Sequence, residues 1–170
     1  LTDASVAGVA ADSGKLLWRA PRKGETAVIP TPVVQDDHVF VTSGYGVGCD
    51  LFRVTRSGGS FKAEQVYANK NLTNHHGGVV LVGDHVYGTT GQTLACVELK
   101  TGEQKWAFKM NDVTDAGVMT TASDVLFTGN REGFFFVLDA RNGNLLWKLN
   151  LGGQASSTPK AHLPTSAPGP

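Results

Sequence analysis

The sequence predicts an all-β fold, a β-propeller of four-stranded antiparallel blades, from a short phrase that recurs along the chain. The phrase reads ADSGKLLW at residues 11–18, LKTGEQKW at 99–106 and LDARNGNLLW at 138–147. Each copy ends in one of the chain's three tryptophans, Trp18, Trp106 and Trp147. In each copy a glycine precedes the tryptophan by four positions, at Gly14, Gly102 and Gly143. Recurrence at a fixed spacing is the mark of a repeat architecture.

A fourth, degenerate copy lies midway between the first two. Gly14 and Gly102 are 88 residues apart, and Gly102 and Gly143 are 41 residues apart. Gly58 lies 44 residues from each of its neighbours, within the segment RSGGSFK, which keeps the glycine and lacks the tryptophan. Four copies at a period of 41 to 44 residues match the length of one propeller blade.

Short β-rich runs precede the repeated phrases. They occupy residues 39–42, 79–82, 85–88, 125–128 and 134–138, and Gly, Asp or Asn bounds each of them. Each phrase then adds a tight turn and a further strand, because Asp, Asn and Gly tolerate the backbone angles that a hairpin turn requires. No window shows a sustained apolar period of 3.6 residues, so no helix is expected.

The repeat divides the chain into about 3.5 blades. Residues 1–20 form the last two strands of a blade, and residues 27–67, 68–109 and 114–150 form three blades. Residues 151–159 lead into a further inner strand, and the Pro/Ser/Gly-rich residues 160–170 form an extended tail. A closed propeller has roughly four to eight blades. We therefore expect a partial ring, or a ring closed by other chains or by copies of this one.

The tryptophans are expected on the outer strands, packed between adjacent blades. A buried indole stabilises such an interface by on the order of 2–3 kcal/mol. The alternative, in which one of the three stacks on a ligand, stays open.

Composition excludes some classes of function. The chain has 15 Lys and Arg against 15 Asp and Glu, without a basic stripe, so nothing favours nucleic acid as a partner. The apolar runs are too short to cross a membrane. Cys49 and Cys96 lie 47 residues apart, and either a disulfide or two buried free thiols is compatible with that spacing.

The three tryptophan phrases resemble the tryptophan-docking repeats of the pyrroloquinoline-quinone-type β-propellers. Residues 120–154 resemble a late blade of a quinoprotein dehydrogenase, and residues 44–106 resemble propellers described as quinone-binding-like. The resemblance implies a periplasmic or secreted protein, with pyrroloquinoline quinone and calcium as cofactors of the family. The family includes alcohol dehydrogenases and many non-catalytic relatives.

The dehydrogenase site does not carry over to this sequence. In the family, a Glu, an Asn and an Asp hold calcium beside a catalytic Asp, often with two adjacent cysteines. Here the cysteines are far apart, and no segment matches the calcium ligands or the catalytic Asp. We therefore predict no catalytic residue and no metal ligand in this chain.

Three residues are weak candidates for binding a cofactor. His75 and His76 precede two glycines, at the expected entry to an inner strand near the ring axis. Adjacent residues of a strand point to opposite faces, so the two imidazoles are not expected to chelate one metal ion. A structural role and a ligand role both stay open for the pair. Arg131 lies in an expected turn and faces a neighbouring blade or solvent, whereas Asp115 is interpreted as a turn former.

Three functions are compatible with these observations. The first is a non-catalytic propeller segment that acts as a scaffold or interaction module. The alternative is part of a quinone-dependent alcohol or sugar dehydrogenase. Its active site would be completed by missing blades or by another chain. The third is a propeller that binds polysaccharide or peptide. Fold alone does not choose between them.

Overall fold

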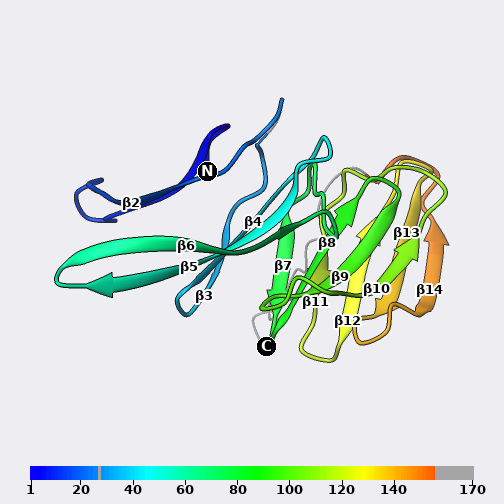
Figure 1. Ribbon diagram of the computed structural model, residues 1–170. Helices are drawn as coiled ribbons and strands as arrows, with labels where there is room; N and C mark the ends of the chain where they lie inside the picture. The colour runs from blue at the N-terminus through cyan, green and yellow to red at the C-terminus, as the bar shows by residue number, and fades with distance from the viewer. Residues whose placement is uncertain (27, 156–170) are drawn as a thin grey trace, which may run out of the picture.

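The computed structural model describes residues 1–26 and 28–155 as four antiparallel sheets arranged in an arc (Figure 1). These residues contain fourteen strands and no helix, which confirms the all-β prediction and its count of about 3.5 blades. No helix among them is long and apolar enough to traverse a lipid bilayer. Residues 156–159 of the expected inner strand and the expected tail, 160–170, lie outside the described residues.

The first sheet has two strands, and each of the other three has four. The first pairs β1 (Ser5–Val9) with β2 (Leu16–Pro21). The second runs β3 (Val33–Gln35), β4 (His38–Ser43), β5 (Gly48–Ser57) and β6 (Ser60–Asn69). The third runs β7 (Val79–Val82), β8 (His85–Thr90), β9 (Thr93–Glu98) and β10 (Gln104–Lys109). The fourth runs β11 (Met119–Thr120), β12 (Val125–Gly129), β13 (Phe134–Asp139) and β14 (Leu145–Asn150).

The inner strands of neighbouring blades lie next to one another, β3 beside β7 and β7 beside β11. β1 and β2 therefore end the arc on one side, and β14 forms the outer edge of the last sheet (Figure 1). Each strand pairs with the strand that precedes it in the chain, so every blade is a simple meander.

One backbone hydrogen bond recurs in the three four-stranded blades and joins the inner hairpin to the outer hairpin. The amides of Val54, Leu99 and Ala140 donate to the carbonyls of Asp37, Asp84 and Asp124, at 2.7, 2.8 and 2.8 Å respectively. The recurrence identifies Val54, Leu99 and Ala140 as equivalent positions. It therefore gives a structural register for comparing the blades.

The core consists of three clusters of buried side chains, one at each junction between successive sheets. The cluster between the first two sheets contains Val6, Ala20, Val39, Val41 and Phe52. The next contains Phe40, Cys49, Leu51, Leu72, Val86, Val97 and Leu99. The last contains Tyr87, Leu94, Cys96, Met110, Val118, Leu126, Phe136, Leu138 and Ala140. Because the clusters lie between sheets, each blade depends on its neighbour to cover its apolar face.

An aromatic side chain seals the junction between the third and fourth blades. The indole N–H of Trp106 donates to the carbonyl oxygen of Ala140 at 2.9 Å. Its ring covers Gly143, where an added Cβ would lie 2.5 Å from the indole. Gly143 also has a φ of 74°, which disfavours any residue with a side chain. The turn glycine of one blade thus provides a flat surface for the aromatic ring of the blade before it.

Tyr67 makes the equivalent contact between the second and third blades. Its hydroxyl donates to the carbonyl oxygen of Leu99 at 2.8 Å, and its ring lies against Gly102, where a Cβ would be 2.7 Å away. Leu99 and Ala140 are the equivalent positions defined above, so Tyr67 stands where the next blade has Trp106. Gly58 lies elsewhere, at the tip of the long β5–β6 hairpin, where an added Cβ would have no neighbour within 4 Å.

The other two tryptophans differ in their environment. Trp18 lies on β2, opposite Gly8 of β1, and packs against the cluster between the first two sheets. Trp147 lies on β14, with half of its surface exposed. The exposure follows from its place on the outer strand of the last described sheet.

Trp106→Ala and Trp147→Ala should therefore have unequal effects on stability. Loss of the Trp106 contact removes a packed ring and a hydrogen bond and should lower the free energy of unfolding by about 2–4 kcal/mol. The same change at Trp147 should cost less than about 1 kcal/mol. Urea denaturation of both variants measures the difference. Equal losses would contradict the stabilising role assigned to the Trp106 contact.

Candidate functional site

Polar side chains from several connections gather at one end of the blades. In an antiparallel blade, the loop that enters the inner strand and the turn between the second and third strands lie at the same end. His75 and His76 come from the loop before β7, and Asp115 comes from the loop before β11. Tyr45 lies in the β4–β5 turn, and Arg131 lies in the β12–β13 turn. The aromatic contacts of Tyr67 and Trp106 involve turns at the other end.

His75, His76 and Asp115 form a cluster of partly buried ligand groups. One potential ligand atom from each residue lies within 4.8 Å of the other two. The two imidazole rings are 4.0 Å apart, centre to centre. The Arg131 guanidinium forms an ion pair with the Asp115 carboxylate. The structure thus brings together the three candidates from the sequence and adds Asp115, which the sequence pattern had marked only as a turn former.

The expectation that His75 and His76 point to opposite sides of a strand is wrong. Both precede β7, which begins at Val79, and they lie in a loop where strand alternation does not apply. Gly77 and Gly78 follow with φ values of 80° and 74°. A Cβ on Gly77 would be 2.6 Å from the backbone nitrogen of Gly117. This close approach brings the histidine loop against the loop that carries Asp115.

The second blade also holds His75 in place. The imidazole lies against Gly44, where a Cβ would be 2.6 Å from the His75 Cδ2 atom. The ring of Tyr45 meets the imidazole edge-on, with the centres 4.4 Å apart. A shallow pocket of about 310 Å³ opens here, lined by Gly44, Tyr45, Thr73, His75, Thr90 and Gly91. The Nε2 atom of His75 is buried and has no hydrogen-bond partner among the described residues.

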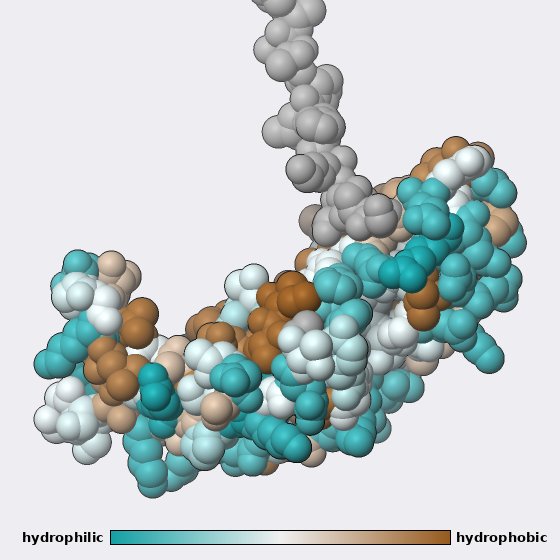
Figure 2. All heavy atoms as spheres, turned by 90° about the horizontal axis from the view of Figure 1, so that it is seen from above, coloured by the Kyte–Doolittle hydropathy of each residue, from teal (hydrophilic) through white to brown (hydrophobic). Residues whose placement is uncertain are grey.

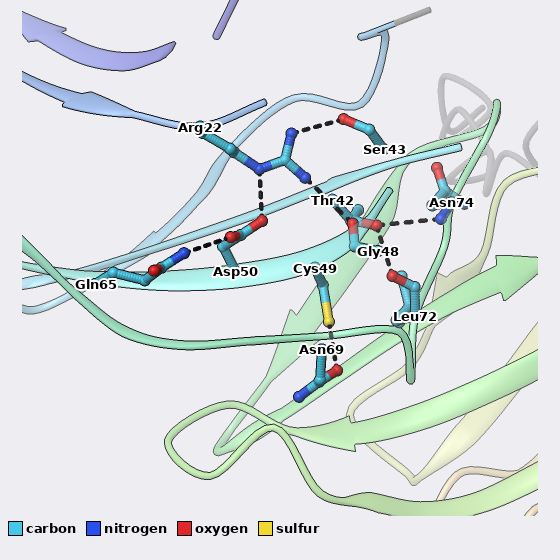
Figure 3. A network of polar contacts seen from close by, with 10 residues as sticks. All are labelled: Arg22, Thr42, Ser43, Gly48, Cys49, Asp50, Gln65, Asn69, Leu72 and Asn74. Carbon is cyan, nitrogen blue, oxygen red and sulfur yellow. Dashed lines mark hydrogen bonds and ion pairs between the residues drawn. The ribbon is translucent and has the colours of Figure 1, made fainter. Parts of the chain in front are cut away.

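Asn74 anchors the loop from the other side. Its backbone amide donates to Oγ1 of Thr42 at 3.1 Å, and its side-chain amide donates to the carbonyl oxygen of Thr89 at 3.0 Å. The Thr42 hydroxyl in turn donates to the carbonyl oxygen of Leu72 at 2.9 Å (Figure 3). The residue before His75 is therefore fixed to β4 of one blade and to β8 of the next.

A second polar network, not predicted from the sequence, joins the first two blades (Figure 3). Arg22 is almost fully buried, and its Nε donates to Oδ2 of Asp50 at 2.6 Å. Its two terminal nitrogens donate to Ser43 Oγ at 2.9 Å and to the Gly48 carbonyl at 3.2 Å. Gln65 donates to the other Asp50 oxygen at 2.7 Å. Because Asp50 neutralises its charge and each of its three side-chain nitrogens donates a hydrogen bond, Arg22 has a structural role.

Cys49 and Cys96 are free and buried. They belong to different clusters of the core, so the disulfide considered above does not form between them. Burial raises the pKa of each thiol to about 11. The thiols therefore stay protonated at neutral pH, and they pack as small apolar groups.

A larger concavity of about 440 Å³ lies beside the outer turns, at the end opposite the histidines. It is lined by Val82, Gly83, His85, Tyr87, Cys96, Lys105, Asp124, Ala140 and Arg141. Its two basic side chains have partners: Lys105 pairs with Glu98 and Glu103, both at 2.9 Å, and Arg141 pairs with Asp139 at 2.6 Å. The hydrogen bond from Arg141 lowers the pKa of Asp139 to about 2. Because Lys105 and Arg141 are already paired with carboxylates, the cavity offers no unpaired lysine or arginine for an anionic ligand, and it is a poorer candidate than the histidine cluster.

The sequence matches a known family over most of its length. A family model described as outer membrane protein assembly factor BamB matches residues 2–108 and again residues 90–165. The chain belongs to this family of PQQ-type β-propeller repeats.

Curated relatives of the chain include quinoprotein dehydrogenases. The quinoprotein alcohol dehydrogenase PedE of Pseudomonas putida is 37% identical over 67 residues, which are 39% of this chain and 11% of that protein. The 1-butanol dehydrogenase (quinone) of Thauera butanivorans is 28% identical over 156 residues, which are 88% of this chain and 22% of that protein. The matched segments are thus small parts of these relatives.

Solved structures share the propeller fold at low sequence identity. BamB from Moraxella catarrhalis aligns with a TM-score of 0.64 and 17% identity, over 91% of this chain and 45% of that one. The computationally designed Ika8 protein aligns with a TM-score of 0.72 and 12% identity, over 94% of this chain and 48% of that one. These likenesses confirm the propeller architecture.

The histidine cluster does not fit the calcium ion that the resemblance implies. Calcium takes about six to eight oxygen ligands, whereas His75, His76 and Asp115 offer two imidazoles and one carboxylate. Pyrroloquinoline quinone is a tricarboxylate, and the cluster's only guanidinium, Arg131, is already paired with Asp115. The donor set therefore differs in chemical type from a site for either group.

The buried pair of Arg22 and Asp50 makes a testable contribution to stability. Arg22→Met alone should lower the free energy of unfolding by about 3–5 kcal/mol, because it leaves the Asp50 carboxylate buried and unpaired. The double variant Arg22→Met/Asp50→Leu should lose less than the sum of the two single variants. Urea denaturation of the four proteins completes the cycle.

The exposed pair of Arg53 and Asp37 is a matched control, because its nitrogen–oxygen distance is also short, 2.7 Å. The same cycle there should give a coupling below about 1 kcal/mol, since water screens exposed charges. Equal coupling in the two cycles would contradict the assignment of Arg22 and Asp50 as a buried structural pair.

Proposed function

We propose that this chain is a segment of a propeller ring that acts as a non-catalytic scaffold or interaction module. The observation that carries the proposal is an apolar face on the fourth blade that no described residue covers. β14 is exposed along its whole length, including Leu145, Leu146, Trp147 and Leu149. Leu151 follows, with 53% of its surface exposed. Figure 2 shows apolar side chains gathered at several places on the molecular surface.

The same positions in the preceding blade show what this face is built to contact. Strand pairing makes Phe127, Phe135, Val137, Trp147 and Leu149 the counterparts of Tyr87, Leu94, Cys96, Trp106 and Phe108. In the third blade these side chains form, or pack against, the cluster that joins it to the fourth blade. In the fourth blade the Phe127 and Phe135 rings stack 6.0 Å apart, and Trp147 is half exposed. An open face with this pattern favours docking against another blade.

The partner is therefore a blade of the same kind, with a turn glycine for Trp147 to cover and a carbonyl oxygen for its N–H. Such a blade comes from a further part of the same polypeptide, from a second copy, or from another chain. The family description as an outer membrane assembly factor supports a scaffold role, and it supports a periplasmic or secreted location. Docking at this face would extend the arc toward a closed ring.

A second candidate function is part of a quinone-dependent alcohol or sugar dehydrogenase. The 37% identity to the alcohol dehydrogenase PedE of Pseudomonas putida favours it. In that case the catalytic groups and the ligands for pyrroloquinoline quinone and calcium would come largely from blades beyond these. The donor set of the histidine cluster, which is wrong for calcium, weighs against a complete site in this chain.

The scaffold proposal predicts that association depends on the open face. In a native mass spectrum, the full chain should form discrete dimers or larger closed species, since its apolar face is buried only on assembly. Trp147→Ser/Leu149→Ser should shift the chain to monomer. Val66→Ser serves as the control, because Val66 is also about half exposed but lies on β6. If the wild-type chain stays monomeric, or if the control dissociates equally, self-association through this face is excluded.

A dye-linked assay tests whether this chain by itself carries a dehydrogenase site. With added pyrroloquinoline quinone and Ca²⁺, the chain should reduce no dye in the presence of primary alcohols or aldoses, because its cluster offers one carboxylate where calcium takes about six to eight oxygen ligands. A quinoprotein dehydrogenase run in parallel verifies the assay. Alcohol-dependent dye reduction by this chain would overturn the scaffold proposal in favour of the enzyme.

A further inference from the structure

We propose that His75, His76 and Asp115 bind a divalent transition-metal ion, with zinc as the reference ion. Two imidazoles and one carboxylate form a donor set that suits first-row transition metals. The same set is poorly suited to calcium or magnesium, which prefer oxygen. The site lies between two blades and does not require a closed ring, so it is independent of the scaffold proposal.

The geometry is close to that of a bound state. The three ligand atoms lie within 4.8 Å of one another. Ligands bonded to zinc at about 2.0–2.2 Å in a tetrahedron are roughly 3.3–3.6 Å apart. Side-chain rotations that move each ligand by about an ångström therefore suffice to close the site around an ion.

The buried Nε2 atom of His75 is an independent indication of a ligand. It has no hydrogen-bond partner among the described residues, and an unpaired buried polar atom is costly. Gly44 and Tyr45 pack on the ring, and Asn74 fixes the preceding residue to two strands. An imidazole on an anchored loop, with an unsatisfied nitrogen, is suited to coordinate a metal ion.

Two loops from adjacent blades supply the ligands. Both histidines lie before β7, and Asp115 lies before β11. The contact of Gly77 with the Ala116–Gly117 backbone brings the loops together without a metal. A bound ion would therefore cross-link the third and fourth blades. With three protein ligands, a tetrahedral ion would keep a fourth position for water or for a donor from a partner.

Arg131 competes with the metal for Asp115. Its guanidinium pairs with that carboxylate, and 45% of the side chain is exposed. The pair neutralises Asp115 while the metal is absent, and an exposed arginine can move away when a cation arrives. The positive charge should weaken metal binding, so its removal should tighten it.

Zinc titration of the full 170-residue chain without a polyhistidine tag, in competition with a chromophoric chelator, tests the proposal. The wild type should bind one Zn²⁺ per chain. His75→Asn and His76→Asn should each weaken binding more than about 100-fold, exceeding the roughly 10- to 100-fold loss caused by removing a group that only orients a ligand. Asp115→Asn should also weaken it. His85→Asn, which alters a histidine outside the cluster, should leave the affinity unchanged.

Arg131→Gln provides a readout that misfolding cannot imitate. It should tighten zinc binding by up to about fivefold, because a partly exposed ion pair of this kind contributes little more than that. Zinc should also raise the melting temperature of the wild type and not that of His75→Asn, since a ligand that binds only the folded state stabilises it. The proposal is overturned if the wild type binds no zinc, or if the histidine variants bind it as tightly as the wild type does.

Discussion

The contact of one aromatic ring with the turn glycine of the next blade is the interaction on which the arrangement of these blades depends. Trp106 and Tyr67 each bury a ring against a glycine and donate one hydrogen bond to the carbonyl three residues before that glycine. Burial of the ring contributes on the order of 2–3 kcal/mol, and the hydrogen bond contributes about 1 kcal/mol more. Because the hydrogen bond is directional, it fixes the register of one blade on the next as well as their separation.

The substitution of tyrosine for tryptophan shows which features of the contact are required. Both side chains present a flat apolar ring and one donor at its far end. Tyr67 and Trp106 reach equivalent acceptors, the carbonyls of Leu99 and Ala140, at 2.8 and 2.9 Å. Ring and donor are therefore kept while the residue type changes, which explains how the second blade functions without a tryptophan at this position.

Much of the fold follows from local patterns, and the remainder depends on contacts between distant residues. Repeated turns and short β-rich runs are properties of neighbouring residues, so the sequence predicts the all-β architecture and about 3.5 blades. The sequence pattern did not predict the contact of Tyr67, because β5 and β6 have ten residues each. Their length places Tyr67 nine positions after Gly58, whereas each tryptophan follows its glycine by four. Arg22 was missed for a related reason. It lies beside Lys23 and resembles a surface charge, but Asp50, 28 residues away, neutralises it in the interior.

The histidine cluster shows the same division, because the sequence identifies His75, His76 and Arg131 as unusual but contains no sign that Asp115 joins them. The prediction of opposed imidazoles failed because Gly77 and Gly78 adopt positive φ, and the strand begins only at Val79, after the histidines. The packing of Gly77 on the Ala116–Gly117 backbone brings the histidine loop against the loop of Asp115, and the ion pair with Asp115 adds Arg131.

The two ends of the blades are thus under different physical constraints. At the outer turns, the third and fourth blades each offer a glycine and a carbonyl to the blade before them, and the repeated phrase is preserved there. At the loops that enter the inner strands, the backbone only has to reach the next blade, and the equivalent positions carry His75 in one blade and Asp115 in the next. The loop end also carries contacts between blades, the Arg22–Asp50 pair and the hydrogen bonds of Asn74 to Thr42 and Thr89, beside the histidine cluster. Loop-end side chains outside these contacts can therefore change without weakening the aromatic contacts at the outer turns.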